Sequence, residues 1–348
     1  MRTKNLIIGL LSLVVLVLVF FITTNSQKQE EADFDVIEIG TGGDPQWSPD
    51  GTKIAFLYKG WLCLAKADGK GEVQKLFEIP KTAYRYHWLD TTEFLFQETE
   101  QLREEDGRLL EITNRLTGVS LNGTKRTVVE CKQDLTSPFF FSPPIFMPDG
   151  TVGYYQFPPG KSWVSDNAVF KVIKQGKLSP DSSLKQLRAV VIPSTPYGIE
   201  GDVWLESLDK SVKKRVTTGK LYSFPQLSPN GTKVLVGLRV VDLDGNERHI
   251  GKGGVDTANI SESSLDPKWS PDSKKIAYTR VTAKILDWDG QAIEDIAGKI
   301  HIVNADGSNL EVIDIPDVVA VGPVWSPDGK KIACTGKNIG KVYIIKLK

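Results

Sequence analysis

One short string recurs along the chain and limits the folds that the chain can adopt. Its four clear copies are 45–56 (PQWSPDGTKIAF), 225–236 (PQLSPNGTKVLV), 267–278 (PKWSPDSKKIAY) and 323–334 (PVWSPDGKKIAC). Two shorter, degenerate copies fit the same template, at 87–96 (HWLDTTEFLF) and 144–154 (PIFMPDGTVGY). Such self-similarity indicates a repeat architecture in which each copy is one structural unit.

The composition of the string predicts a strand, a tight turn and a second strand. Ser48-Pro49-Asp50-Gly51 matches a type I turn, with Pro at the second position and Gly at the fourth. Pro presets its own φ and pushes the preceding Ser towards extended geometry, which suits the end of a strand. The Trp before the turn is a large apolar anchor, and a short β-rich run follows the turn.

Further strands complete each unit. Third strands with alternating apolar positions are expected at 61–69 (WLCLAKADG), 201–209 (GDVWLESLD) and 299–307 (KIHIVNADG), and fourth strands at 73–77 and 213–217. Four strands per unit is the composition of a propeller blade. The sequence therefore predicts an all-β fold, a β-propeller of four-stranded antiparallel blades.

The spacing of the anchors predicts six blades, with seven as the alternative. The anchors are Trp47, Trp88, Met147, Leu227, Trp269 and Trp325, and the shorter intervals between them match a blade of about 40–45 residues. The longest interval contains 157–197, where strands at 168–173 and 187–192 are predicted to form an extra hairpin. The alternative is a seventh blade whose first half has diverged.

The two ends of the repeat region are expected to share a blade. Only one strand, 341–348 (KVYIIKLK), follows the last turn motif. The missing outer strand is predicted at 35–39 (DVIEI), just before the first motif. Pairing these two segments closes the ring and removes its exposed edges.

The W-S-P-D-G-x-K-I-A-F string resembles the repeat of TolB-type β-propellers, a WD-like repeat built around Pro-Asp. The resemblance covers roughly 34–348. It implies a propeller and a tendency to bind proteins or peptides. TolB itself is a soluble periplasmic protein with an additional N-terminal α/β domain, and this chain departs from that pattern because an apolar segment precedes its repeats.

That apolar segment predicts one transmembrane helix before the propeller. Residues 6–22 (LIIGLLSLVVLVLVFFI) carry no charge and no Pro. We assign 1–5 as a cytoplasmic segment, 6–24 as a membrane anchor, 25–33 as a flexible tether and 34–348 as the propeller. Arg2 and Lys4 place the N-terminus in the cytoplasm and the propeller outside it. The alternative is a secreted or periplasmic protein whose signal peptide has been cleaved.

Few residues point to chemistry. Lys plus Arg and Asp plus Glu both total 43, so the chain lacks the basic footprint of a nucleic-acid binder. Propellers of this type also occur fused to serine hydrolases, but no G-x-S-x-G elbow is present and the chain ends within its last blade, so no peptidase domain is expected. The three histidines, His87, His249 and His301, stand far apart, without metal-site spacing.

Cysteines and acidic loops are interpreted as structural. Cys63 and Cys334 fall at strand positions and are expected to be packed, whereas Cys131 is placed in an irregular segment. The loops 242–245 (DLDG) and 287–290 (DWDG) are expected to be ordinary hairpin turns, with a Ca²⁺ site as the less favoured alternative.

The function predicted from these features is a membrane-anchored, extracytoplasmic scaffold that binds a protein or peptide without catalysing a reaction. The alternative is a carbohydrate-active enzyme, a lyase or glycosidase, with its site in the central channel. No catalytic, cofactor or metal-binding residue is named, and no cofactor is expected. Clustered carboxylates, or His with Lys or Arg, in the channel are expected for an enzyme. The aromatic stretch 139–146 is expected to pack an inter-blade loop; the alternative is that it and the insertion 157–197 line or cover a face of the ring.

Overall fold

The computed structural model describes residues 34–80, 83–103, 107, 109–133, 145–146, 152–156, 169–174, 187–193, 201–207, 213–217, 225–251, 260–285 and 293–348. All regular secondary structure in these residues is β-strand. No helix among them is long and apolar enough to cross a membrane. The predicted anchor at 6–24 lies outside the described residues and stays a prediction.

The described strands form seven antiparallel sheets, numbered here in chain order. Sheet 1 consists of β2 (Gly43–Trp47), β3 (Lys53–Tyr58), β4 (Trp61–Lys66) and β5 (Gln74–Glu78). Sheet 2 consists of β6 (Ala83–Trp88), β7 (Glu93–Arg103), β8 (Leu109–Ser120) and β9 (Lys125–Gln133). Sheet 3 consists of β10 (Ile145–Phe146), β11 (Val152–Gln156) and β12 (Val169–Lys174), and sheet 4 of β13 (Leu187–Pro193), β14 (Gly201–Ser207) and β15 (Lys213–Arg215).

The remaining three sheets have four strands each. Sheet 5 consists of β16 (Gln226–Leu227), β17 (Lys233–Val236), β18 (Arg239–Asp242) and β19 (Glu247–His249). Sheet 6 consists of β20 (Ile260–Trp269), β21 (Lys275–Ile285), β22 (Ile293–Asn304) and β23 (Glu311–Ile313). Sheet 7 consists of β24 (Ala320–Trp325), β25 (Lys331–Gly336), β26 (Lys341–Leu347) and β1 (Phe34–Thr41).

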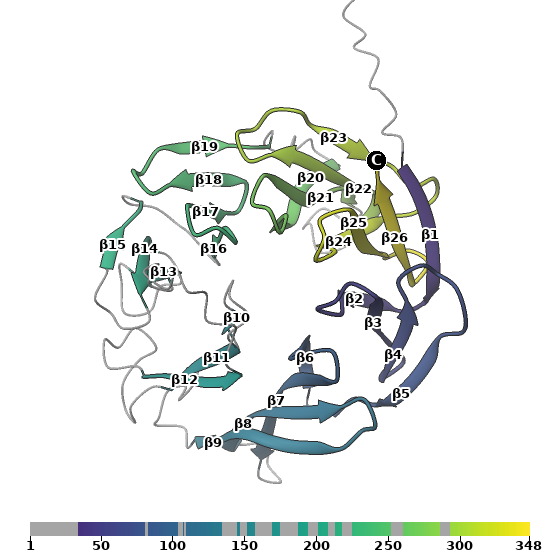
Figure 1. The fold of residues 1–348 in the computed structure, drawn as a ribbon, viewed down its shortest axis with the longest axis vertical. Helices are drawn as coiled ribbons and strands as arrows, with labels where there is room; N and C mark the ends of the chain where they lie inside the picture. Colours follow the sequence, from purple (N-terminus) through teal and green to yellow (C-terminus); the bar gives the residue numbers. More distant parts are fainter. Residues whose placement is uncertain are drawn as a thin grey trace, which may run out of the picture. The chain divides into compact units, whose positions relative to one another are not determined.

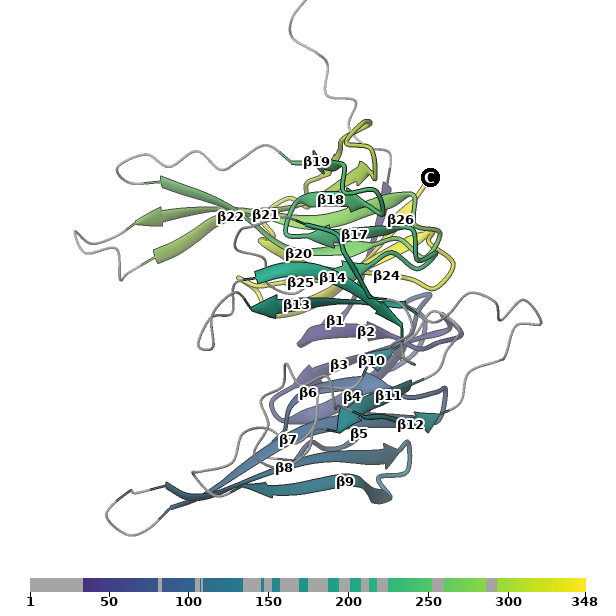
Figure 2. The same ribbon diagram turned by 90° about the vertical axis from the view of Figure 1, so that its left-hand side faces the viewer.

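Hydrophobic packing between neighbouring sheets arranges them as a ring (Figure 1). Each buried apolar cluster joins two sheets: 7 with 1, 1 with 2, 2 with 3, 4 with 5, 5 with 6, and 6 with 7. A sheet of a sandwich buries one face, whereas here sheets 1, 2, 5, 6 and 7 each pack against two neighbours. The predicted β-propeller arrangement is therefore confirmed. The hairpins of sheets 2 and 6, which contain the longest strands, project beyond their neighbours (Figure 2).

The structure corrects the prediction made for 157–197. Strands are present near both predicted positions, but β12 pairs with β11 and β13 pairs with β14, so they belong to different sheets and the hairpin prediction is wrong. The run Ser179-Pro180-Asp181-Ser182, which lies outside the described residues, is a further copy of the turn motif that the sequence comparison did not count. Two sheets have three described strands, so the blade count itself stays a prediction.

The predicted closure of the ring is confirmed. Strand β1 pairs antiparallel with β26, from Phe34 opposite Leu347 to Thr41 opposite Lys341. The pairing is extended by a backbone bond in which Gly42 N–H donates to the Gly340 carbonyl at 2.7 Å. The first and last described strands thus complete sheet 7, and each closes an edge that the other would leave exposed.

Each turn motif is held by a buried serine. At the first copy, the Ser48 hydroxyl donates to Asp50 Oδ1 at 2.6 Å, and the backbone N–H of Lys53 donates to Ser48 Oγ at 2.9 Å. The backbone N–H of Gly51 donates to the Ser48 carbonyl at 2.8 Å, which closes the predicted turn. The same set recurs around Ser228, Ser270 and Ser326. Hydrogen bonds from the serines lower the pKa of Asp50, Asp272 and Asp328.

The tryptophan anchors do more than fill space, because each donates a hydrogen bond to the preceding sheet. The Trp47 indole N–H donates to the Val324 carbonyl at 2.9 Å, and that of Trp88 to the Gln46 carbonyl at 3.2 Å. The Trp269 indole N–H donates to the Gln226 carbonyl at 3.2 Å, and that of Trp325 to the Lys268 carbonyl at 3.1 Å. Each acceptor is the residue immediately before the anchor of the preceding sheet. The repeat therefore encodes a clip between consecutive sheets. Leu227, the anchor of sheet 5, has no side-chain N–H and cannot form this hydrogen bond.

Removing one indole N–H should destabilise the ring measurably. We expect Trp325→Phe to lower the free energy of unfolding by about 1–2 kcal/mol, because the Lys268 carbonyl loses its donor while most of the apolar contact is kept. Trp61→Phe is the control, since no hydrogen bond of the Trp61 indole is seen within the described residues. Chemical denaturation measures both variants. Equal destabilisation by the two substitutions would contradict a specific role for the clip.

Candidate functional site

The innermost strands carry the positions of the repeat that vary most in charge. The first position lies three residues before the anchor and is occupied by Asp44, Arg85, Asp266 and Gly322. The second lies one residue before the anchor and is occupied by Gln46, His87, Gln226, Lys268 and Val324. These residues lie on β2, β6, β16, β20 and β24, or next to them, and these strands line the centre of the ring (Figure 1). The turn residues stay nearly constant while these two positions change, which is typical of a scaffold with a variable lining.

A bulge in the innermost strand sets the backbone at three of these positions. The pairing skips between Gly43 and Gln46 in β2, between Leu265 and Lys268 in β20, and between Val321 and Val324 in β24. At the bulges Asp44, Asp266 and Gly322 have φ values of 55°, 52° and 64°. Asp tolerates this left-handed region better than most residues, and Gly does so freely. A bulge redirects side chains away from the regular alternation of a strand.

Neighbouring sheets hold the bulge at Asp44 in place. The Asp44 N–H donates to Thr335 Oγ1 of sheet 7 at 3.1 Å. From sheet 2, the Tyr86 hydroxyl donates to the Asp44 carbonyl at 2.6 Å and lies 3.1 Å from the Ala55 carbonyl. Tyr86 is fully buried, which raises the pKa of its hydroxyl well above the usual value and keeps it a donor. The same type of bond recurs at Gly322, whose N–H donates to Thr279 Oγ1 at 3.0 Å.

Five side chains from three sheets share one electrostatic environment, and we call them the axial cluster: Asp44, Arg85, His87, Asp266 and Lys268. Burial raises the pKa of Asp44, although its side chain stays accessible to solvent; Arg85 opposes this shift and Asp266 adds to it. Burial lowers the pKa of His87 to about 4, and the positive charges of Arg85 and Lys268 lower it further. His87 and Lys268 belong to sheets 2 and 6, which have sheets 1 and 7 between them, so their interaction acts across the axis of the ring.

The axial cluster combines several kinds of polar group. In formal charge its two aspartates and its two cations balance, and a pKa of about 4 leaves the His87 imidazole neutral at neutral pH. No group of three or more His, Cys, Asp or Glu side chains suited to a metal ion occurs among the described residues. The cluster therefore suits a polar ligand that carries charges of both signs.

Sequence reasoning missed this cluster. It named no site residue, and it found no metal-site spacing around His87. The other two histidines are elsewhere: His249 is exposed on the outer strand β19, and His301 is buried on β22 with its ring 5.2 Å from that of Tyr278. The repeat does contain a signal that identifies Asp44 and Asp266, because both stand three residues before a Trp anchor.

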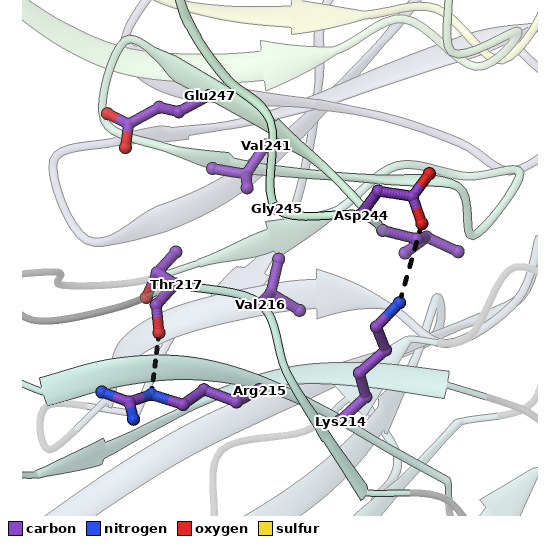
Figure 3. Close-up of a pocket in the computed structure, with 9 residues that line it drawn as sticks. Lys214, Arg215, Val216, Thr217, Val241, Asp244, Gly245 and Glu247 are labelled. Carbon is purple, nitrogen blue, oxygen red and sulfur yellow. Dashed lines mark hydrogen bonds and ion pairs between the residues drawn. The ribbon is translucent and has the colours of Figure 1, made fainter.

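A second hollow lies at the rim between sheets 4 and 5 (Figure 3). This rim groove encloses about 400 Å³ and is lined by Lys214, Arg215, Val216, Thr217, Val241, Leu243, Asp244, Gly245 and Glu247. Lys214 Nζ lies 3.9 Å from Asp244 Oδ1 and spans the groove. The Arg215 Nε donates to the Thr217 carbonyl at 3.0 Å.

The acidic loop 242–245 is a hairpin turn held by its own carboxylate. Asp242 Oδ1 accepts from the N–H groups of Asp244 and Asn246, both at 2.9 Å, and Oδ2 accepts from the Asn246 amide at 2.8 Å. These bonds lower the pKa of Asp242. The structural interpretation of this loop is thus confirmed, whereas the loop 287–290 lies outside the described residues.

Two of the three predictions made for cysteines are confirmed. Cys63 and Cys334 are buried free thiols, and burial raises the pKa of Cys334 to about 12, so it is no nucleophile. Cys131, predicted to lie in an irregular segment, is instead part of strand β9, opposite Asn114 of β8. That correction follows from the unusual length of the strands in sheet 2.

The low pKa of His87 predicts a pH-dependent loss of stability. Below pH about 6.5 the unfolded chain binds a proton at His87 that the folded protein accepts only near pH 4, so stability falls as the pH falls through this window. Relative to its value at pH 7.5, the free energy of unfolding should fall by about 1–3 kcal/mol less in His87→Gln than in wild type as the pH is lowered to 4, as measured by chemical denaturation. His249→Gln controls for the loss of a histidine as such. Parallel pH profiles for wild type and His87→Gln would refute this assignment.

Known relatives of the chain include peptidases. It is 30% identical over 121 residues to the uncharacterized peptidase YuxL of Bacillus subtilis, a match that covers 32% of this chain and 16% of YuxL. It is 31% identical over 199 residues to dipeptidyl-peptidase 5 of Trichophyton tonsurans, which covers 51% of this chain and 25% of that enzyme. The chain thus spans about a quarter or less of the length of these curated relatives.

No protein-family model matches the chain. Among solved structures, it is similar to a protein from Agrobacterium tumefaciens assigned as TolB, with 16% identity, a TM-score of 0.38, and coverage of 90% of this chain and 97% of that one. The sheets, their packing and the ring closure described above identify the fold independently. The resemblance to TolB-type propellers that the repeats predict is confirmed at the level of fold: the chain is a β-propeller.

Proposed function

We propose that the protein is a membrane-anchored, extracytoplasmic β-propeller that acts as a non-catalytic scaffold and binds a peptide or protein segment at the axial cluster. The observation that carries this proposal is the cluster itself, in which carboxylates, cations and a neutral imidazole stand on the innermost strands of three sheets and influence one another's charge. A polypeptide carries charges of both signs together with backbone donors and acceptors. Such a ligand matches the cluster better than a ligand of one charge does.

The rigidity of the lining supports a binding role. The Asp44 backbone is fixed by Thr335 and Tyr86, and the strand that carries Asp266 is tied to sheet 7 through the Trp325 clip. A backbone held in this way loses little conformational freedom on binding. We further propose that the ring has seven blades, which the seven sheets support.

The membrane part of the proposal rests on the sequence of residues 1–33. An uncharged run of 17 residues at 6–22 follows two basic residues. N-terminal sequencing of the protein from isolated membranes tests it. A mature chain that retains this run and resists alkaline extraction supports the anchor, whereas a chain that starts near residue 25 and extracts freely points to a cleaved signal peptide.

The alternative function is a carbohydrate-active enzyme with its site in the central channel. Its supporting observation is that the axial cluster holds a combination expected of an enzyme, a histidine with cations: the charges of Arg85 and Lys268 reach the neutral His87, and a lyase needs a proton acceptor close to cations that neutralise a sugar carboxylate. A glycosidase would instead use two carboxylates, for which Asp44 and Asp266 are the candidates. The peptidase relatives support a third possibility, a propeller that serves a peptidase, but they match it over a minor part of their length.

Neutralising the axial aspartates tests the binding proposal. We expect Asp44→Asn with Asp266→Asn to weaken binding to an array of immobilised decapeptides about tenfold or more, because Asn keeps the bulge but removes the charge. The control, Asp35→Asn with Glu72→Gln, removes two exposed carboxylates on an outer strand and a surface turn, and it should stay within about twofold of wild type. Equal binding by both double variants would contradict the proposal.

A turnover assay separates the two main functions. Wild-type protein is incubated with the selected decapeptides and, separately, with oligouronides and neutral oligosaccharides. The scaffold proposal predicts that all of these remain intact. Unsaturated products from oligouronides that disappear in His87→Gln would support the lyase and overturn the scaffold.

A further inference from the structure

The seam between sheets 4 and 5 differs from the other seams of the ring. The structure describes the anchor residue at five seams, and at four of them a tryptophan clips one sheet to the preceding one. At the fifth, Leu227 is half-buried and contributes packing alone. The rim groove opens at this seam, so the absence of a clip coincides with a hollow between the two sheets.

The floor of the groove is apolar and belongs to the core. Val216 and Val241 are 5% and 1% exposed, and both are part of the cluster that joins sheets 4 and 5. Leu243, from the hairpin between β18 and β19, packs against the same cluster. Val216 and Val241 are therefore fixed by burial, and the half-buried Leu243 is the apolar side chain of the floor that a ligand can reach.

The two walls carry opposite charges (Figure 3). Lys214 and Arg215 stand on the sheet 4 wall, and Asp244 and Glu247 stand on the sheet 5 wall. Arg215 and Glu247 already have ion-pair partners on their own sheets: Arg215 pairs with Asp202, and Glu247 pairs with Arg239. The outer pair is loose: the Lys214 and Asp244 side chains are 52% and 86% exposed and lie 3.9 Å apart.

A loose exposed ion pair costs little to separate, since such pairs contribute about 0–1 kcal/mol. A ligand can therefore take the place of each partner, presenting a carboxylate to Lys214 and an ammonium to Asp244 while an apolar group rests on the floor. A volume of about 400 Å³ accommodates a few side chains. These features specify a short linear segment with an acidic, an apolar and a basic side chain.

We propose that the rim groove is a second binding site, which takes an extended segment of a partner protein that carries an acidic and a basic residue on either side of an apolar one. This site is separate from the axial cluster. The charge of each wall sets the specificity, and the apolar floor sets the position of the segment.

Peptides of defined charge test this inference. The probes are labelled heptapeptides that centre on Leu and differ only in its neighbours: Gly-Gly-Glu-Leu-Lys-Gly-Gly, Gly-Gly-Lys-Leu-Lys-Gly-Gly and Gly-Gly-Glu-Leu-Glu-Gly-Gly. We expect wild-type protein to bind the mixed peptide about threefold or more tighter than either single-sign peptide at low salt, measured by fluorescence anisotropy.

Changing the sign of one wall should change which peptide is preferred. Arg215 and Glu247 keep their own partners, so Lys214→Glu replaces the loosely paired cation by a carboxylate and should shift the preference to the doubly basic peptide, whereas Asp244→Lys should shift it to the doubly acidic one. Lys275→Glu is the control, because it makes the same charge change in another exposed ion pair, with Glu311 at 3.0 Å. Thermal unfolding of each variant confirms that it is folded.

Three results would overturn the rim site: no peptide preference in wild type, no switch in the two groove variants, or the same switch in Lys275→Glu. The rim site and the axial proposal fail separately. Asp44→Asn with Asp266→Asn should leave the heptapeptide preference unchanged, and the groove variants should leave decapeptide binding at the axis unchanged.

Discussion

The pairing of β1 with β26 is the constraint on which the rest of the structure depends. Each sheet has two faces, and in sheets 1, 2, 5, 6 and 7 both faces are buried because each packs against a neighbouring sheet around the circle. Without β1, sheet 7 would end at β26 and present an unpaired edge. Because these strands come from the two ends of the described chain, closure also ties together the segments most prone to fray.

Within that closed ring, the repeated string performs two tasks. The buried serine and its Asp or Asn partner fix the turn inside one sheet, and the indole N–H joins that sheet to the one before it. Both tasks use backbone groups that would otherwise be buried without a partner, which is a strong reason for the string to stay constant. At the positions that face the axis this duty is not shared by every copy: the Gln46 and Gln226 amides donate to the Tyr86 and Pro267 carbonyls of the next sheet, whereas the other copies carry His87, Lys268 and Val324 there.

This division explains what could be predicted from the sequence. The Ser-Pro-Asp-Gly turns and the pairing of residues 35–39 with the C-terminal strand follow from local turn chemistry and from the need to complete a blade. The hairpin assigned to 157–197 was wrong because a strand run does not state its partner, and β12 and β13 each pair with a different sheet. The cross-ring proximity of His87 and Lys268 depends on closure and could not be obtained from spacing along the chain. The rim groove likewise depends on how β15 of sheet 4 and the β18–β19 hairpin of sheet 5 meet, which spacing along the chain does not give.

A designed disulfide tests ring closure most directly. Asp35 and Lys346 face each other across β1 and β26, and both are exposed. In a Cys131→Ser background, Asp35→Cys with Lys346→Cys places two thiols at a Cα separation that a disulfide can bridge. The account predicts an intramolecular disulfide in the folded protein, seen as altered mobility on non-reducing gels, together with a higher midpoint of unfolding. Cysteines that stay reduced under oxidising conditions, or that join only separate molecules, would contradict it.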